Sequence, residues 1–256
     1  MKTIILCGGY GTRLKEETEF KPKPMVFVAN QPILWYIMKH YAHFGFNEFI
    51  LALGYKADYI KDFFLNQKAF TSDFSLNTKT HEVDYHFENS KNNDEFKITF
   101  VDTGLNTLPG ERILKCQKYL TDENFMVTYG DGVSNIDISK LSEFHSSRKT
   151  LATITGVHPR SRFGMMKIRG NYITNLTEKP ILNDWVNGGF MVFNKKALKF
   201  IKKGETEHPG LQRLANKKQL SIYKHNGFWF CVDTYKEVST LNEMWKQKTT
   251  PWKVWK

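Results

Sequence analysis

A glycine-rich segment that follows a short apolar run constrains this chain more than any other feature. Residues 3–6 read Thr-Ile-Ile-Leu, and residues 8–14 read Gly-Gly-Tyr-Gly-Thr-Arg-Leu. The apolar run predicts a first β-strand that ends where the glycines begin. Glycine permits positive φ and leaves backbone N–H groups uncovered, so we expect an anion-binding nest here. Arg13, Lys21 and Lys23 add positive charge. Together these residues predict a polyphosphate site in an α/β fold.

The motif differs from two commoner phosphate loops. A P-loop requires Gly-Lys-Ser/Thr at its end, whereas Arg13 follows Gly11 and Thr12 here. A dinucleotide fingerprint requires a third small residue where this chain has Leu14. An ordinary strand-to-helix turn is the alternative interpretation of the glycines. The added Thr-Arg and the Lys-Pro-Lys-Pro of residues 21–24 favour phosphate binding.

Composition is typical of a globular protein that acts in a reducing compartment. The chain has 256 residues, 41% hydrophobic and 25% charged, which suits one α/β core. No apolar run is long enough for a membrane span, and the N-terminal run ends at Gly8, too early for a signal peptide. Cys7, Cys116 and Cys231 are few and widely spaced, so we expect neither disulfides nor a zinc site. We therefore expect a cytoplasmic protein.

The net charge of +11 allows three interpretations. It could serve nucleic-acid binding, steer small polyanionic substrates into a cleft, or form a solvated lysine-rich surface. The lysines are spread along the chain and no nucleic-acid-binding motif occurs. We therefore expect small-molecule substrates, and neither nucleic acid nor a membrane as a partner.

Short β-rich runs alternate with helical patterns, which predicts an α/β fold with a Rossmann-like mixed, mainly parallel sheet flanked by helices. We expect a single domain over residues 1–256, with a nucleotide-binding front half at 1–134 and an acceptor-binding back half at 135–256 that also makes oligomer contacts. Expected strands are 3–6, 49–53, 98–101 and 125–129, then antiparallel strands at 152–157, 165–168, 172–177 and 190–193. Expected helices are 32–44, 57–64, 112–120 and 235–246.

The stretch 67–95 has a polar composition with few agreeing signals. Residues 83–87 predict one strand of a hairpin arm, which could serve an interface. Residues 89–95, rich in Asn and Lys, predict a surface loop.

Two aspartates are candidate metal ligands. Asp131 follows the apolar run 125–129 and lies between two glycines, so we expect it at the carboxyl edge of the sheet, facing the glycine loop. A carboxylate there suits Mg²⁺, and an Asp-Gly turn is the alternative. Asp233 follows the apolar, aromatic run 227–232. It could bind a metal, cap the helix expected from Tyr235, or do both.

These motifs resemble the sugar-1-phosphate nucleotidylyltransferases, which join a nucleotide to a sugar phosphate and release pyrophosphate. The signature is Gly-Gly-x-Gly-Thr-Arg-Leu followed by Lys-Pro. Within that family the chain is most similar to the glucose-1-phosphate cytidylyltransferases, and the resemblance extends over almost the whole chain. The matching segments are 16–18, 21–26, 32–38, 101–104, 128–132 and 251–255.

The resemblance implies a nucleotide-diphospho-sugar transferase fold and the transfer of a cytidylyl group from CTP to a sugar 1-phosphate. It implies α-D-glucose 1-phosphate as acceptor, CDP-glucose as product, Mg²⁺ as cofactor and a homo-oligomer. It also implies a place in deoxysugar synthesis for surface polysaccharide such as O-antigen. The acceptor phosphate is already ionised, so we expect direct in-line attack without a general base.

The resemblance also implies roles for single residues. Arg13 would contact the β- and γ-phosphates, Lys23 would lie beside the α-phosphate, and Asp131 with Asp233 would bind the metal; Arg13, Lys23 and Asp131 are the expected catalytic residues. The expected nucleotide-binding residues are Leu6, Gly8, Gly9, Gly11, Thr12, Arg13, Lys23, Thr103, Gly104 and Arg112. The expected acceptor-binding residues are Glu178, Lys179, Asn187 and Gly188.

Three segments depart from the cytidylyltransferase pattern. Residues 109–112 read Pro-Gly-Glu-Arg instead of Thr-Gly-Gly-Arg, residues 181–184 lack the Gly-Asp-Gly turn, and residues 207–210 replace Glu-x-Glu-Pro. All three lie where acceptor or base contacts are expected. A different acceptor, or UTP or dTTP as nucleotide, therefore remains an alternative. A non-catalytic nucleotide-binding regulator and a basic RNA-binding domain are the alternatives from other classes.

Overall fold

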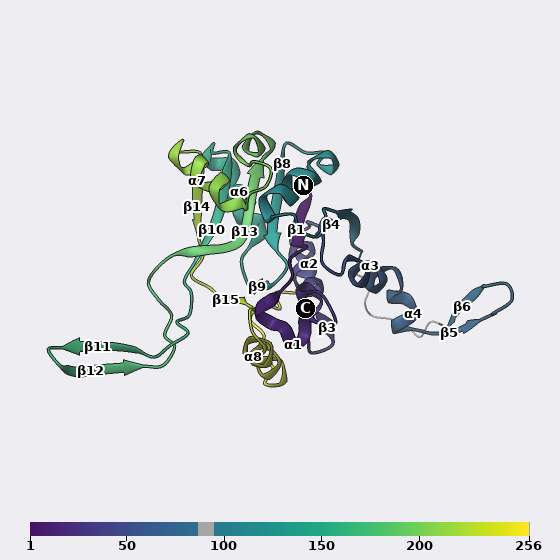
Figure 1. Ribbon diagram of the computed structural model, residues 1–256, viewed down its shortest axis with the longest axis horizontal. Helices are drawn as coiled ribbons and strands as arrows, with labels where there is room; N and C mark the ends of the chain where they lie inside the picture. Colours follow the sequence, from purple (N-terminus) through teal and green to yellow (C-terminus); the bar gives the residue numbers. More distant parts are fainter. Residues whose placement is uncertain (87–94, 256) are drawn as a thin grey trace.

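A computed structural model describes residues 1–86 and 95–255 and contains a central seven-stranded sheet (Figure 1). The order of its strands is β14-β10-β13-β8-β1-β4-β7. In chain order, the strands are β1 (Thr3–Cys7), β4 (Glu48–Leu53), β7 (Lys97–Asp102), β8 (Asn124–Tyr129), β10 (Ala152–Val157), β13 (Val186–Asn194) and β14 (Leu220–Lys224).

The strand directions confirm the expected mixed, mainly parallel sheet. β1 pairs in parallel with β4 and β8, and β4 pairs in parallel with β7. β13 runs antiparallel to both β8 and β10, which confirms the expected change of direction in the second half. β14, which was not expected from the sequence, pairs in parallel with β10. Because β8 and β13 are neighbours, the two halves of the chain share one sheet.

Helices cover the sheet. The longer ones are α2 (Ile33–His43), α3 (Ala57–Leu65), α5 (Pro109–Cys116), α6 (Ile138–Arg148), α7 (Glu207–Asn216) and α8 (Tyr235–Lys246). The shorter ones are α1 (Lys15–Thr18), α4 (Gln67–Thr71) and the 3₁₀ turns Thr12–Leu14, Lys23–Met25, Gln117–Tyr119 and Lys195–Phe200.

The expected helix boundaries hold best where proline and glycine mark them. Pro32 is the N-cap of α2, and Gly45 follows its end with φ of +85°. The helix expected at 112–120 begins earlier, because Pro109 occupies its first turn, and it ends in a 3₁₀ turn. Among the longer helices, α6 and α7 were not expected from the sequence.

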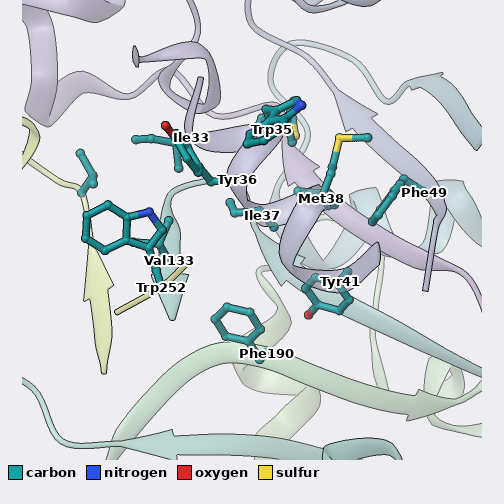
Figure 2. Packing of buried hydrophobic residues seen from close by; sticks show 14 of the residues in the cluster. Ile33, Trp35, Tyr36, Ile37, Met38, Tyr41, Phe49, Val133, Phe190 and Trp252 are labelled. Atoms are coloured by element: carbon teal, nitrogen blue, oxygen red, sulfur yellow. The ribbon is translucent and has the colours of Figure 1, made fainter. Parts of the chain in front are cut away.

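Both faces of the sheet are buried, as a parallel sheet requires. Along β1 the side chains alternate: Ile5 packs in the cluster that includes α2, and Ile4 packs in the cluster on the opposite face. Figure 2 shows Tyr41 of α2 beside Phe190 of β13; their rings stack with centroids 5.8 Å apart. Full burial of each such side chain contributes about 1.5–3 kcal/mol. This packing fixes α2, and with it the loops at the carboxyl edge.

Two hairpins project from opposite sides of the molecule (Figure 1). β5 (Asp73–Leu76) pairs with β6 (Val83–His86), which confirms the expected hairpin arm. Residue 87 and most of the loop expected at 89–95 lie outside the described residues. β11 (Met165–Arg169) pairs with β12 (Tyr172–Thr177), so both expected strands are confirmed, but they form a separate arm outside the sheet.

Two further strand pairs are short. β2 (Phe27–Val28) pairs with β3 (Gln31–Pro32), and β9 (Gly132–Ser134) pairs with β15 (Trp229–Cys231). Among the described residues, no helix combines the length and the apolar character needed to cross a bilayer.

Candidate active site

A cavity of about 360 Å³ lies at the carboxyl ends of β1 and β8. The glycine loop forms one wall, residues 105–109 form another, and Tyr129 to Asp131 form the floor. Seven of the expected site residues line it: Leu6, Gly8, Gly9, Gly11, Lys23, Arg112 and Asp131. This is the edge at which ligands bind in open α/β sheets.

The glycines of the loop meet different requirements. Gly11 has φ of +65°, and a Cβ there would lie 2.7 Å from Thr18 Cγ2. Gly8 is not in the left-handed region, but a Cβ on it would collide with the guanidinium of Arg112. The sequence predicted positive φ for the glycines of this loop in general, but of Gly8, Gly9 and Gly11 it is Gly11 that has it. After the loop, Thr12 and Arg13 lie in an exposed 3₁₀ turn.

The Arg112 guanidinium, which lines the cavity, holds its wall together. It is 3% exposed and donates to the backbone carbonyls of Gly8, Leu53, Gly104 and Leu105 and to Thr103 Oγ1. Thr103 Oγ1 in turn donates to Leu53 O. Burial lowers the pKa of Arg112 from its usual value. The expected nucleotide contacts of Thr103, Gly104 and Arg112 stay predictions, since these groups are engaged with one another.

The pairing of β9 with β15 brings the two aspartates together. Cys231 is the register partner of Gly132, and Val232 N donates to Asp131 O over 2.9 Å. Lys23 lies between the aspartates: its Nζ is 2.6 Å from Asp131 Oδ2 and 2.8 Å from Asp233 Oδ1. Burial alone would lower the pKa of Lys23, but the Asp131 and Asp233 carboxylates outweigh it and raise the pKa.

Two arginines complete the charge cluster. Arg13 Nη1 lies 2.6 Å from Asp233 Oδ2, and Arg162 Nη2 lies 3.1 Å from the same oxygen. Burial would raise the pKa of Asp233, but Lys23, Arg13 and Arg162 together hold it below its usual value. Arg162 was missed in the sequence, where it follows an unremarkable Pro-Arg-Ser run with no motif of its own.

Asp233 does not cap α8, so that alternative is wrong. Thr234 is the N-cap and forms a capping box with Glu237. The Asp233 backbone N–H also donates to Glu237, over 2.6 Å. The Asp233 carboxylate is thereby left for the cationic residues. Lys21, by contrast, pairs with Glu17 over 2.7 Å and takes no part in the cluster.

The donor set fits a divalent cation. Asp131, Cys231 and Asp233 each offer one ligand atom, and these atoms lie within 4.8 Å of one another. Two carboxylates are what Mg²⁺ usually takes from a protein, with phosphate and water oxygens completing its coordination. Cys231 was missed as a member of this group. A signal was present in the sequence, because Cys231 precedes Asp233 by two and alternate residues of an extended segment share a face.

The expected acceptor residues lie to one side of the cavity. Glu178 and Lys179 follow β12 at the base of the arm, with Lys179 in the left-handed region at φ of +45°. Neither lines the cavity. Asn187 Nδ2 lies 3.4 Å from the hydroxyl of Tyr129, which does line it, and Gly188 O accepts from Trp229 Nε1 over 2.8 Å.

Comparisons with known proteins agree with this geometry. A family model described as nucleotidyl transferase matches residues 2–245. The chain is 41% identical over 258 residues to a probable glucose-1-phosphate cytidylyltransferase of Bacillus subtilis strain 168, covering all of both chains. It is 38% identical over 259 residues to the glucose-1-phosphate cytidylyltransferase of Salmonella typhimurium, again over the full length of both.

Similarity to solved structures extends over the whole fold. A UDP-glucose pyrophosphorylase complexed with UDP-glucose superimposes with a TM-score of 0.69. The match covers 96% of this chain and 98% of the other, with 15% sequence identity. At that identity the likeness concerns the fold alone.

Proposed function

Since this chain belongs to the nucleotidyl transferase family, we propose that it transfers the cytidylyl group of CTP to glucose 1-phosphate and releases CDP-glucose and pyrophosphate. The observation that carries the proposal is the cluster of Lys23, Asp131 and Asp233 beside the glycine-lined cavity. A polyphosphate needs fixed cations and a metal-binding carboxylate pair, and this cluster offers both.

The reaction needs charge neutralisation more than proton transfer. The acceptor phosphate attacks the α-phosphorus in line while pyrophosphate departs, so negative charge spreads over the reacting oxygens. Arg13 would contact the β- and γ-phosphates, and Lys23 would contact the α-phosphate. A charge pair at about 4 Å contributes about 1 kcal/mol in water and about 4 kcal/mol at an effective dielectric of about 20, so the partial burial of Lys23 strengthens its effect.

Mg²⁺ is the cofactor that we propose, held by Asp131 and Asp233. When bound, it would polarise the phosphate oxygens and neutralise part of their charge. The glycine loop, with Leu6 at its start and Thr12 at its end, would hold the triphosphate, and Thr103 and Gly104 would contact the nucleotide. Glu178, Lys179, Asn187 and Gly188 would hold the acceptor. The front half, 1–134, thus serves the nucleotide and the back half, 135–256, serves the sugar phosphate within one domain.

We also propose a homo-oligomer. The β11–β12 arm exposes apolar side chains along its whole length, including Ile168 at 65% and Tyr172 at 80%. An isolated two-stranded hairpin is marginally stable in water, and exposed apolar patches mark protein contacts. Light scattering after size exclusion tests this assembly, which would be refuted by a monomeric mass. Three free cysteines support a reducing cytoplasm as the location.

The proposed reaction is tested by pyrophosphate release from a matrix of nucleoside triphosphates and sugar 1-phosphates, with and without Mg²⁺. We expect turnover with CTP, glucose 1-phosphate and metal. Asp131→Asn should abolish most of it, whereas Asp122→Asn, an exposed aspartate paired with the N-terminus, should not. Turnover with UTP or dTTP instead would overturn the cytidylyl assignment. Turnover with another sugar 1-phosphate instead of glucose 1-phosphate would change the assigned acceptor. Absence of turnover with every pair would favour a non-catalytic nucleotide-binding protein.

A further inference from the structure

Arg162 is fixed to the acceptor side of the candidate active site. It lies between β10 and β11, and its neighbour Ser161 donates its backbone N–H to Pro180 O over 2.8 Å. Leu182 N donates back to Pro159 O over 2.9 Å. These bonds tie the segment 159–164 to the segment 178–182, which contains Glu178 and Lys179. The backbone of Arg162 therefore moves with the proposed acceptor-binding residues.

The side chain of Arg162 reaches from there to the phosphate side. Its Nη2 lies 3.1 Å from Asp233 Oδ2. Arg13, which follows the glycine loop, contacts the same oxygen through Nη1 at 2.6 Å. Two guanidinium groups from distant parts of the chain thus contact one anionic oxygen. Guanidinium groups bind carboxylate and phosphate oxygens with the same fork of donors. The Asp233 oxygen marks a point that both arginines can reach together.

The local charge becomes favourable for a further anion once a divalent cation is bound. Arg13, Lys23 and Arg162 contribute three positive charges, and Asp131 and Asp233 contribute two negative ones. The Glu237 carboxylate, which accepts from the Asp233 backbone N–H, contributes a third negative charge. A divalent cation at the aspartates would therefore give the cluster a positive excess that attracts a phosphate.

Arg162 is also free to change partners at low cost. Its side chain is 61% exposed, and the side chain of Arg13 is 65% exposed. Exposed ion pairs are weak, so a phosphate dianion that accepts two hydrogen bonds competes well with Asp233. The Lys23 ammonium, in contrast, is 11% exposed and held by two carboxylates.

We propose that Arg162 binds the phosphate group of the sugar 1-phosphate and, opposite Arg13, aligns it for attack on the nucleotide. This inference rests on the proposed function and names a residue of the acceptor site that sequence motifs did not indicate. The ligand class is any sugar 1-phosphate, because Arg162 binds the phosphate group and not the sugar. Other residues select the sugar.

Arg160 provides a matched control two positions away. It lies on the same segment, and its Nη1 donates to Lys179 O over 3.3 Å, with no bond to Asp233. We compare Arg162→Met and Arg162→Lys with Arg160→Met. Both arginines are exposed, so we expect all three variants to fold, which circular dichroism and thermal melting verify.

The primary measurement is steady-state kinetics with each substrate varied in turn. Loss of a charge-assisted hydrogen bond predicts that Arg162→Met raises KM for glucose 1-phosphate by about 10- to 100-fold. KM for CTP should change by less than about threefold, since Arg13 and Lys23 remain. Arg162→Lys should recover part of the loss, and Arg160→Met should stay near the wild type. Equal effects on both substrates, or no effect on either, would overturn the proposal.

Calorimetry separates this proposal from the proposed function. Glucose, galactose and mannose 1-phosphates are titrated into wild type and Arg162→Met, without requiring turnover. We expect the variant to bind weaker by a similar factor for every sugar 1-phosphate that the wild type binds. If the wild type binds none of them, or the variant binds them equally well, Arg162 has no such role. Absence of CDP-glucose formation alongside a phosphate-binding defect would instead refute the reaction while supporting Arg162.

Discussion

Arg13 Nη1 lies 2.6 Å from Asp233 Oδ2, although 220 residues separate them in the sequence. Arg13 follows the first strand, and Asp233 immediately precedes the capping box of the last helix. The two ends of the chain therefore meet across the candidate active site.

Lys23 should matter for stability as well as for catalysis. Its ammonium separates two carboxylates, so Lys23→Met leaves them facing each other with no cation between. We expect the free energy of unfolding, measured with urea, to fall by about 3 kcal/mol. Added Mg²⁺ should raise the melting temperature of the variant more than that of the wild type, because the metal ion replaces the lost charge.

Lys21→Met is the control for that change. Lys21 pairs with Glu17 at i,i+4, and its ammonium lies 5.6 Å from the centroid of the Phe27 ring, outside the charge cluster. Its loss should cost about 1 kcal/mol. If both variants lose the same stability, Lys23 has no special place in the cluster.

Cys231 should make the metal site receptive to softer cations. Its sulfur lies among the two carboxylates, and thiolate ligands favour metals such as Co²⁺ and Zn²⁺ over Mg²⁺. We expect Co²⁺ to give a sulfur-to-metal charge-transfer band that Cys231→Ser abolishes and Cys116→Ser retains. Mg²⁺ dependence of turnover should change little in either variant. A band that survives in Cys231→Ser would contradict the assignment.

Arg112 should stabilise the cavity wall. Arg112→Met removes five hydrogen bonds and leaves the carbonyls of Gly104 and Leu105 without the donor that Arg112 supplies. The carbonyls of Leu53 and Gly8 keep bonds from the backbone N–H groups of Thr103 and Tyr55. We expect the free energy of unfolding to fall by about 3–5 kcal/mol, with KM for CTP raised in the folded fraction. Arg148→Met, at an exposed site over the ring of Phe144, should cost less than about 1 kcal/mol. A near-neutral Arg112→Met would show that the wall holds without it.

His40 should make the protein sensitive to mild acid. The ring is 3% exposed, and burial lowers its pKa from 6.5 to about 4. The unfolded chain therefore takes up a proton near pH 6.5 that the folded protein accepts only near pH 4. Stability from this group is complete above pH 6.5 and falls by about 3 kcal/mol on acidification to pH 4.

Urea unfolding at several pH values checks this expectation. His40→Gln should flatten the slope between pH 6.5 and 4, whereas His208→Gln, at an exposed site on α7, should leave it unchanged. Identical slopes in wild type and His40→Gln would place the acid sensitivity elsewhere.

The elements that the sequence predicted well have strong local patterns. β1, β4 and β8 are apolar runs buried on both faces, and α2 has a proline at its start and a glycine past its end. α6 was missed because its buried face consists of only Ile138, Leu141 and His145. A polar helix of this kind is fixed by tertiary packing, which no local pattern reports.

The site residues that belong to a sequence motif could be predicted. Those that join the site through a long-range contact could not. The glycine loop and both aspartates were expected, yet the ion pairs that join them form only after the sheet assembles. Arg162 reaches Asp233 across 71 residues. The family resemblance placed Arg112 near the nucleotide, and the structure adds that its guanidinium binds carbonyls of the cavity wall. Its contact with the nucleotide stays a prediction.

Glycine is required at position 8 because a Cβ would collide with a neighbouring side chain, and not because the backbone has a positive φ. The space that its missing methyl leaves is filled by the end of an arginine from a helix more than a hundred positions later. Enlarging position 8 would evict that arginine, and shortening the arginine would leave a hollow behind the phosphate loop. These two sites must therefore change in concert or not at all, and a redesign of the loop has to begin at residue 112.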